Sequence, residues 1–241
     1  MHYYYITGVS RGIGKALVEE LLKNENNYVI GIGRTNALKH ERFEFIKLDL
    51  MKLDLVKEFR FIQIIDAQSI TLVNNAGMLG NVNHVGKLDN QSIIDSFSLN
   101  TIAPAILMNN FALAYQQFDG KKLVLNISSG AGRHTIESWS CYCGSKSALD
   151  MYTAVAETEQ AEFYKSNPVK FLSVAPGIID TQMQNEIRAV DKSRFNKVDT
   201  FINYKEEGKL TNPKDLARQL IDLIDKSTSF NNPLLDIREL Y

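Results

Sequence analysis

The stretch YYYITGVSRGIGKALVEELLKN, residues 3–24, decides the fold of this chain. YYYIT predicts a strand, and apolar residues at helical spacing after residue 14 predict a helix. Between them, Gly8, Gly12 and Gly14 allow a tight turn in which the backbone comes close to a ligand. The free N–H groups at the start of the helix favour an anionic group such as a pyrophosphate. The stretch therefore predicts a dinucleotide-binding strand, turn and helix.

The same turn also matches the GxSxG pattern, which places a nucleophilic serine between a strand and a helix in α/β hydrolases. Such a hydrolase needs an acid and then a histidine later in the chain. The histidines are residues 2, 40, 84 and 134, so none lies in the last hundred residues. An elbow at the first strand would also leave no sheet before it. We therefore favour a cofactor turn comprising Gly8, Ser10, Arg11, Gly12, Ile13 and Gly14.

Two arginines bear on which dinucleotide this turn would bind. In dinucleotide folds an acidic residue roughly 20 residues past the glycines binds the ribose 2′-hydroxyl. Counted from Gly14, that position is occupied by Arg34. A guanidinium there, together with Arg11, favours the 2′-phosphate of NADP(H) through charge-assisted hydrogen bonds. The alternative interpretation is that both arginines are solvated surface residues.

Predicted strands and helices alternate along the rest of the chain. This alternation predicts an α/β fold with a single doubly wound parallel sheet of Rossmann type, flanked by helices on both faces, with its ligand at the carboxyl ends of the strands. The further strands are predicted at residues 28–35, 43–50, 70–77, 122–128, 169–177 and 234–237, and the helices at about 91–117 with an interruption at Pro104, 140–164 and 212–226.

Two of these strand ends carry candidate cofactor contacts. Asp49 follows the third strand and either accepts a hydrogen bond from an adenine amino group or caps the helix beginning near Lys52. Asn75, Ala76 and Gly77 follow the fourth strand, where small residues let a cofactor ring pass close to the backbone. The same residues are also ordinary turn formers.

The stretch SSGAGRHTIESWSCYCGSK, residues 128–146, holds a hydroxyl, a phenol and an ammonium. Tyr142 and Lys146 are four residues apart and therefore stack on one helix face. A positive charge beside the phenol is expected to lower its pKa from the usual value of about 10. Ser129, at a strand end, is placed to hold a substrate oxygen. Taken alone, the pair also fits an amphipathic helix with a surface lysine.

Asn100 lies within the helix predicted at 91–117, where a buried amide needs a partner. It either binds a water beside Lys146 or hydrogen-bonds a neighbouring carbonyl. Residues 178–210 are polar with scattered Met, Phe and Tyr, a profile typical of a mobile segment that covers and selects a substrate. We interpret residues 1–241 as one domain, with 178–210 as its substrate-covering loop.

Composition excludes several partners. The 27 basic and 28 acidic residues leave a net charge of −1, which gives no footprint for nucleic acid or an anionic membrane surface. No apolar run approaches about 20 residues, and the sequence begins without a secretory signal, so we expect a cytoplasmic protein. Cys141 and Cys143 are two residues apart, which suits neither a helical disulfide nor a CxxC metal site, and we expect free thiols and no metal.

Five motifs in register carry a family resemblance. They are TGVSRGIG at 7–14, NNAG at 74–77, NISS at 126–129, YCGSK at 142–146 and PGIIDT at 176–181. Over essentially its full length the chain resembles the short-chain dehydrogenase/reductase family. The approach to Tyr142 through Trp139, together with APGIIDTQMQ and KEEGKL, is similar to the branch of sepiapterin reductases and bacterial benzil reductases.

The resemblance implies roles for individual residues. Ser129 would orient the carbonyl, Tyr142 would be the acid/base, and Lys146 would bind the ribose and lower the pKa of the tyrosine. Asn100 would complete a proton relay. Pro176, Gly177 and Thr181 belong to the motif on the nicotinamide side, and Thr181 would contact the carboxamide. Basic residues matching Arg11 and Arg34 mark NADP(H)-preferring members of the family.

The activity implied is NADPH-dependent reduction of a ketone, in this branch one carbonyl of an α-dicarbonyl, by a homodimer or homotetramer. Two alternatives remain: a short-chain alcohol dehydrogenase of another substrate class, and an NADP-binding sensor without catalysis. Asp236 either corresponds to the pterin-anchoring acid of sepiapterin reductases or is an exposed aspartate at a strand end.

Overall fold

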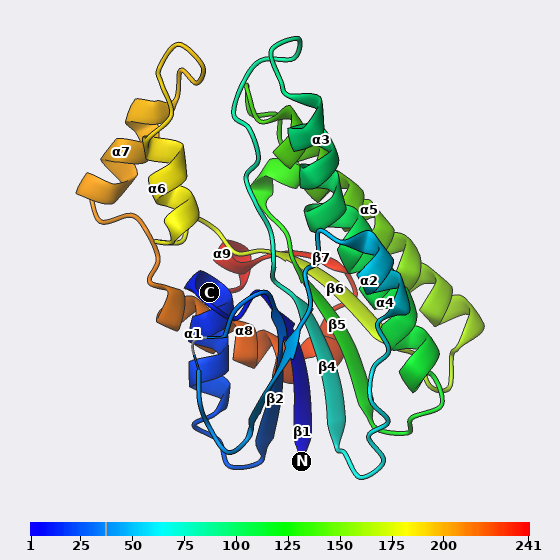
Figure 1. The fold of residues 1–241 in the computed structure, drawn as a ribbon. Coiled ribbons are helices and arrows are strands. Elements are labelled where there is room, and N and C mark those ends of the chain that lie inside the picture. Colours follow the sequence, from blue (N-terminus) through cyan, green and yellow to red (C-terminus); the bar gives the residue numbers. More distant parts are fainter. Residues whose placement is uncertain (37) are drawn as a thin grey trace.

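The computed structural model describes residues 1–36 and 38–241. Its centre is a seven-stranded sheet in the order β3-β2-β1-β4-β5-β6-β7, and every neighbouring pair is parallel. The strands are β1 His2–Thr7, β2 Asn27–Gly33, β3 Phe43–Lys47, β4 Ser69–Asn74, β5 Lys121–Ile127, β6 Lys170–Ala175 and β7 Leu234–Asp236. This confirms the predicted doubly wound sheet, whose order reverses between β1 and β4 (Figure 1).

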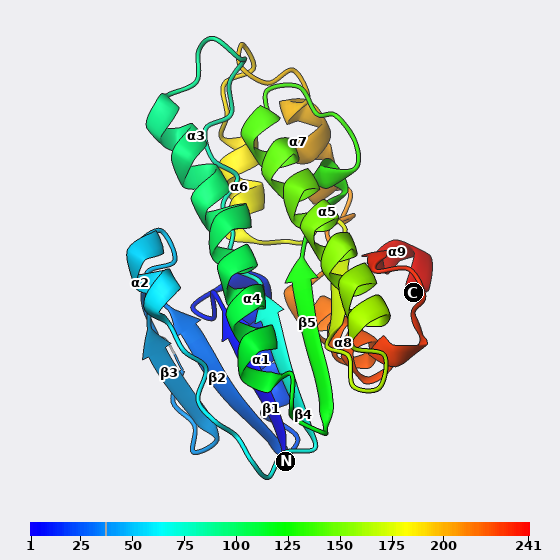
Figure 2. The same cartoon turned by 90° about the vertical axis from the view of Figure 1, so that its right-hand side faces the viewer.

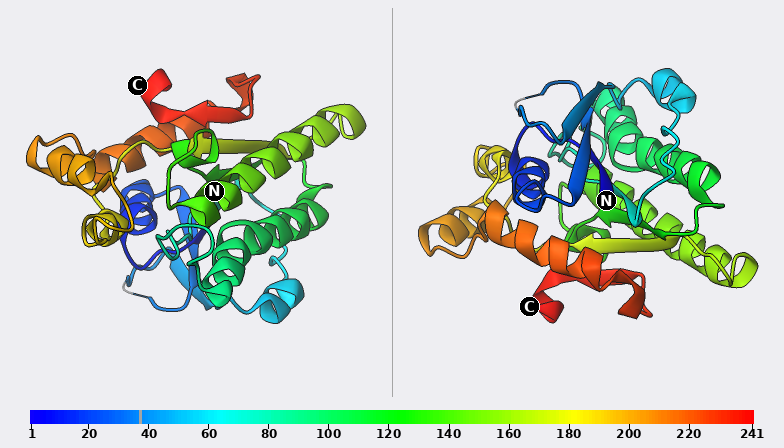
Figure 3. Two further views of the ribbon diagram at one scale, coloured as in Figure 1. Left: turned by 90° about the horizontal axis from the view of Figure 1, so that it is seen from above. Right: turned by 90° about the horizontal axis from the view of Figure 1, so that it is seen from below.

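Helices form a layer on each face of the sheet (Figure 3). The α-helices are α1 Gly12–Leu21, α2 Leu53–Glu58, α3 Asn90–Phe97, α4 Ala103–Tyr115, α5 Ser140–Phe163, α6 Gln182–Arg188, α7 Val198–Glu206, α8 Pro213–Asp225 and α9 Ile237–Leu240. Buried side chains of α1 and α8 form one hydrophobic core with the sheet, and those of α2, α4 and α5 form the other. Within the described residues, no helix is long and apolar enough to cross a membrane.

The first strand shows why both layers form. Tyr4 and Ile6 belong to the core beneath α1 and α8, whereas Tyr5 belongs to the core beneath α4 and α5. Side chains alternate between the two faces of a strand, so a parallel strand covered on both faces must be apolar throughout. The consecutive apolar residues of YYYI meet that requirement, and the glycine turn that follows emerges at the carboxyl edge.

The segment predicted as a helix interrupted at Pro104 stays helical. A π-helical turn, Ser98–Ile102, joins α3 to α4, and Pro104 lies in the first turn of α4. Proline lacks the N–H that would reach the carbonyl of Asn100 in an α-helix. A π turn changes the hydrogen-bonding step, so the chain remains helical through this position.

The segment 178–210 contains regular structure, unlike the mobile loop expected. It begins with a parallel bridge between Ile179 and Thr211 and then forms α6 and α7. Figure 1 shows both helices beyond the carboxyl edge of the sheet. Ile187, Phe195 and Val198 are buried and supply the apolar contacts that hold the helices in place. The sequence did not predict these contacts, because polar residues outnumber apolar ones in this segment.

Candidate active site

A cleft of about 540 Å³ lies at the carboxyl ends of β1, β2 and β4. The residues predicted to bind the cofactor that line this cleft are Gly8, Ser10, Arg11, Gly12, Ile13, Arg34, Asp49, Asn75, Ala76, Gly77 and Thr181. Sequence reasoning missed Met78, Leu99, Gln182, Met183 and Glu186, which also line it. Gly14, Tyr142, Lys146, Pro176 and Gly177 were predicted to bind the cofactor but are not among the lining residues. The missed residues carry no phosphate- or nucleotide-binding pattern, so only the fold places them here.

Asn75 holds the glycine turn in shape. Its amide Nδ2 donates to the carbonyl of Thr7 at 2.9 Å and to that of Gly8 at 3.1 Å. A Cβ on Gly14 would lie 2.4 Å from both the Asn75 Nδ2 and the Gly8 carbonyl oxygen. Gly14 is therefore required for close packing behind the turn, and Asn75 braces the turn from the neighbouring strand.

The turn has free groups for an anionic ligand. Arg11 precedes α1 without a side-chain hydrogen bond to the helix, and the first turn of α1 contains no acidic residue. The backbone N–H groups in the first turn of α1 therefore remain available to a phosphate. Arg11 and Arg34 are exposed at the cleft, where their guanidinium groups can reach a bound anion. These features fit an anionic group such as a pyrophosphate.

Asp49 lines the same cleft from the end of β3. Its Oδ1 accepts a hydrogen bond from the backbone N–H of Met51 at 3.1 Å. The N-cap of α2 is Lys52, so Asp49 supports the turn before the helix and does not cap it. Its second carboxylate oxygen is left for the cleft.

Tyr142 and Lys146 lie together on α5, as their spacing predicts. The Lys146 Nζ is 5.9 Å from the centre of the Tyr142 ring and donates to the carbonyl of Ile127 at 2.8 Å. A Cβ placed on Gly77, in the wall of the cleft, would lie 3.5 Å from the same Nζ. The ammonium therefore lies next to Gly77, beside the cleft but not among its lining residues. Tyr142 and Lys146 are only 7% and 4% exposed.

The expectation that Lys146 lowers the pKa of Tyr142 is wrong for this structure. Burial raises the pKa of Tyr142 to about 12, and a hydrogen bond with the Ser129 hydroxyl opposes that rise. Burial also lowers the pKa of Lys146 to about 8, against the opposing effect of the Asp150 carboxylate. Desolvation therefore outweighs the hydrogen bond from Ser129 for the tyrosine. At neutral pH the phenol keeps its proton, which is the form that can donate one.

The Asn100 side chain hydrogen-bonds to neighbouring protein groups, including a backbone carbonyl, which is the second of the two interpretations given above. The amide Nδ2 donates to the carbonyl of Met78 at 2.8 Å and to the Ser145 hydroxyl at 3.0 Å. The amide oxygen accepts from the Met78 N–H at 2.9 Å. Asn100 thus ties the segment after β4 to α5, next to Lys146.

An aromatic cluster packs against Tyr142. The Trp139 ring lies edge-on to Tyr142 at 5.7 Å between ring centres, and Phe195 and Phe201 from 178–210 lie 5.4 and 5.5 Å from Trp139. The indole Nε1 is buried without a hydrogen-bond partner. Sequence reasoning did not assign this contact, because residues 139 and 195–201 are far apart in the chain.

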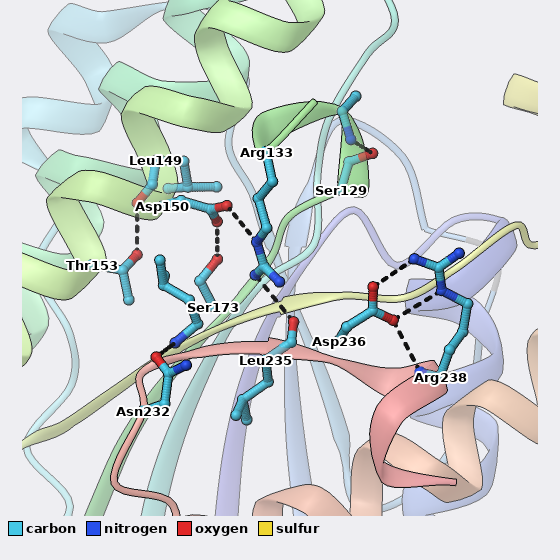
Figure 4. Close-up of polar contacts among 12 residues, drawn as sticks. Ser129, Arg133, Leu149, Asp150, Thr153, Ser173, Asn232, Leu235, Asp236 and Arg238 are labelled. Atoms are coloured by element: carbon cyan, nitrogen blue, oxygen red, sulfur yellow. Dashed lines mark hydrogen bonds and ion pairs between the residues drawn. The ribbon is translucent and has the colours of Figure 1, made fainter. Parts of the chain in front are cut away.

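Asp236 is neither exposed nor free. It is 9% exposed, and its carboxylate accepts hydrogen bonds from the Arg238 guanidinium at 2.9 and 2.6 Å (Figure 4). That guanidinium holds the pKa of the carboxyl below its usual range. Gly177 lies beside this pair, because a Cβ there would be 3.5 Å from the Arg238 side chain.

Both cysteines are free: Cys141 is buried and Cys143 is partly buried. In the part of the chain that the structure describes, no three His, Cys, Asp or Glu side chains form a group that could hold a metal ion.

Comparison with known proteins assigns the family. A family model described as short chain dehydrogenase matches residues 3–192, most of the chain. The chain belongs to the short chain dehydrogenase family. A benzil reductase ((S)-benzoin forming) of Bacillus subtilis (strain 168) is 34% identical over 99% of both chains, and a sepiapterin reductase of Rattus norvegicus is 27% identical over 98% of this chain and 95% of the relative. The crystal structure of the Saccharomyces cerevisiae YIR035C short chain dehydrogenase/reductase superposes with a TM-score of 0.81 at 26% identity, covering 98% and 96% of the two chains.

Membership makes this protein an oxidoreductase of the short chain dehydrogenase type, a family that acts on carbonyl or hydroxyl groups with a nicotinamide cofactor. The resemblance to the benzil and sepiapterin reductase branch is confirmed by these relatives. The free N–H groups and the exposed arginines at the cleft beside the glycine turn could hold the phosphate groups of such a cofactor.

Proposed function

We propose that this protein is an NADPH-dependent ketone reductase that converts one carbonyl of an α-dicarbonyl to a hydroxyl group, giving a hydroxyketone. The observation that carries the proposal is the buried, protonated Tyr142 phenol with the Ser129 hydroxyl and the Lys146 ammonium beside it. The full-length similarity to the benzil reductase of Bacillus subtilis supports the substrate class.

The proposed reaction uses each of these groups at the substrate oxygen or beside it. NADPH supplies the hydride when bound. The Tyr142 phenol donates its proton to the carbonyl oxygen that becomes the alcohol. The Ser129 hydroxyl donates a hydrogen bond to that same oxygen and orients the carbonyl. Lys146 holds the ribose, and Asn100 fixes the segment beside it.

The proposed cofactor contacts follow the cleft. Gly8, Ser10, Gly12 and Ile13 present backbone N–H groups to the pyrophosphate, and Gly14 keeps the turn compact. Arg11 and Arg34 bind the 2′-phosphate, and Asp49 accepts from the adenine. Asn75, Ala76 and Gly77 leave room for the cofactor beside the end of β4. Thr181, at the end of the Pro176–Gly177 turn, contacts the carboxamide.

We also propose that residues 178–210 cover the substrate within one domain and that the protein works as a homodimer or homotetramer. The aromatic contacts of Phe195 and Phe201 with Trp139 support the first point, since Trp139 in turn packs edge-on against Tyr142. Apolar side chains exposed on α4 and α5 support the second, among them Leu113 and Phe163 at 78% and 72% exposure.

The test is a Tyr142→Phe variant assayed for NADPH oxidation with a panel of 1,2-diketones and simple ketones. Loss of general acid catalysis should lower kcat by about 10²–10⁴-fold with little change in folding. Tyr152→Phe, an exposed tyrosine on the same helix, serves as control and should be as active as the parent. A parent protein that reduces none of the ketones, or a Tyr142→Phe variant with full activity, would contradict the proposal.

A further inference from the structure

A buried ion pair lies one helical turn beyond Lys146, outside the residues that the proposed reaction uses. Asp150 is 4% exposed, and its Oδ2 accepts from the Arg133 Nε at 3.2 Å. Its Oδ1 accepts from the hydroxyl of Ser173 on β6 at 2.6 Å. Figure 4 shows the carboxylate between these two donors. Both carboxylate oxygens are therefore fixed.

Arg133 connects this carboxylate to the loop that carries Ser129. It follows the 3₁₀ turn Gly130–Gly132, and its Nη2 donates to the carbonyl of Leu235 on β7 at 3.0 Å. A Cβ on Gly132 would lie 2.9 Å from the backbone carbon of Lys146. The loop therefore rests directly on the turn of α5 that holds Lys146, and the ion pair fastens it one turn further along.

The charges around Lys146 can be named element by element. On α5, Tyr142 is a neutral phenol at neutral pH, and Asp150 is four residues away on the same helix face. Arg133, after the 3₁₀ turn, faces Asp150. The neighbouring groups from β5, the π turn and the end of β4 are the Ile127 carbonyl, Asn100 and Gly77, which are uncharged.

We propose that Asp150 is a positioning residue of this active site: its carboxylate supplies the negative charge beside the buried Lys146 ammonium and, through Arg133, holds the Ser129 loop against α5. The proposal rests on the proposed function in assigning Lys146 and Ser129 to the site. Burial of an ammonium is unfavourable unless a compensating charge is near. Burial lowers the pKa of Lys146, and the charge of Asp150 raises it in opposition, as this arrangement requires.

The experiment titrates the Lys146 Nζ by ¹⁵N NMR in the free, full-length protein, with the signal assigned through Lys146→Met. In Asp150→Asn, loss of the carboxylate charge should lower the pKa of Lys146 by roughly one unit. Asp150→Glu should restore it. Glu157→Gln is the matched control, because Glu157 also lies on α5 and pairs with Lys170 at 2.5 Å but stands several helical turns away from Lys146. In Glu157→Gln, the pKa of Lys146 should be the same as in the parent.

A second variant keeps the test decisive if Asp150→Asn does not fold. In Arg133→Met the carboxylate remains and its competing cation is gone, so the pKa of Lys146 should rise. Amide exchange of Ala131, whose N–H donates to the Ser129 hydroxyl at 3.1 Å, should accelerate in this variant as the loop loosens.

Titration curves of Lys146 that coincide in the parent, Asp150→Asn and Arg133→Met would overturn the proposal. Unchanged exchange at Ala131 would overturn the loop-holding part. Neither measurement requires turnover, so a parent protein that reduces no ketone would contradict the proposed function and leave the NMR result to decide the role of Asp150. In an active parent, the alkaline limb of the kcat profile should move to lower pH in Asp150→Asn by the same interval.

Discussion

Lys146 and Tyr142 are ionisable side chains held almost entirely out of water, and burial moves both pKa values toward the neutral forms. For the tyrosine this favours the phenol, which a reductase needs. For the lysine, burial favours the neutral amine over the ammonium, although the ammonium is the form that a cofactor ribose and phosphate would attract. Burial therefore supports the form of Tyr142 that the reaction uses and disfavours the charged form of Lys146.

Lys146→Met should stabilise the free protein while impairing activity. The pKa of Lys146 falls from the usual 10.5 to about 8 in the folded chain, so its ionised form disfavours folding by about 3 kcal/mol at pH 7. Removing the charge should raise Tm by several degrees in thermal unfolding at pH 7. Between about pH 8 and 10.5 Lys146 is protonated in the unfolded chain and increasingly neutral in the folded one. The free energy of unfolding of the parent therefore rises with pH across that window, and the difference in Tm between Lys146→Met and the parent should shrink.

The control for this prediction is Lys209→Met, which removes a well-exposed ammonium paired with Glu207 and should leave Tm almost unchanged. A Lys146→Met variant that melts below the parent at pH 7, or a difference that grows with pH, would show that the ammonium stabilises the fold.

Arg34→Asp should reverse the preference for NADPH. The carboxylate would repel a 2′-phosphate and accept hydrogen bonds from a ribose 2′-hydroxyl. The ratio of kcat/KM with NADPH to that with NADH should fall by about 10–100-fold, in line with the loss of one charge-assisted contact. Arg60→Asp changes an exposed arginine outside the cleft and should leave the ratio as in the parent. An unaltered ratio in Arg34→Asp would remove Arg34 from the phosphate site.

At the scale of elements, the helices that extend beyond the carboxyl edge of the sheet build the site. α5 holds Tyr142 and Lys146 together, and Asn100 in the π turn donates to Ser145 on the same helix. On the other side, Phe195 just before α7 and Phe201 on α7 pack against Trp139. The sheet fixes the position of the dinucleotide cleft, and these added elements define the space around the phenol.

Phe201→Ala should change which ketones are accepted more than it changes the stability of the protein. Phe201 is partly buried against Trp139, so truncation enlarges the space beside Trp139, the residue that packs on Tyr142, without opening the main cores. In steady-state assays across the ketone panel, KM should change several-fold for bulky diketones, with kcat less affected. Thr200→Ala, exposed on the same helix, is the control. Identical substrate profiles in parent and Phe201→Ala would argue against a covering role.

At the scale of the molecule, the two helical layers differ in what they leave uncovered. Figure 2 shows α4 and α5 side by side on one face. Between them runs a groove of about 620 Å³ lined by apolar residues such as Leu113, Val155 and Phe163. Side chains of this kind that gather on a surface mark an interface in many soluble proteins. This is where we expect the second copy of the chain to bind.

Light scattering should therefore give a mass of at least twice 27.2 kDa for the parent. Phe163→Asp places a charge in the groove and should shift the protein toward monomers, since an unpaired charge is costly at an apolar interface. Ile65→Asp alters a residue that is 83% exposed outside the groove and should keep the parental mass. A monomeric parent would refute the proposed oligomer.

Much of the fold could be predicted because strand and helix patterns are local. The apolar run of β1, the glycine turn and the helix after it specify each other within one short continuous stretch, and Tyr142 and Lys146 are neighbours on any helix. Helix α7 and the π turn escaped prediction, because the apolar pattern of α7 extends over only 9 residues and a π turn has no sequence period of its own. The pairing of Asp150 with Arg133 also escaped, since it depends on how a loop lies on α5.

The sequence by itself determined the doubly wound sheet, the dinucleotide turn and the gathering of a tyrosine with a lysine, since all three follow from periodicity and short-range spacing. Only the tertiary structure decided the electrostatics of that pair. Burial depends on what covers a side chain, and Tyr142 is covered by Trp139, which packs against Phe195 and Phe201 from a much later part of the chain. Burial in the folded chain raises the pKa of the phenol, where local spacing alone predicts a lower one.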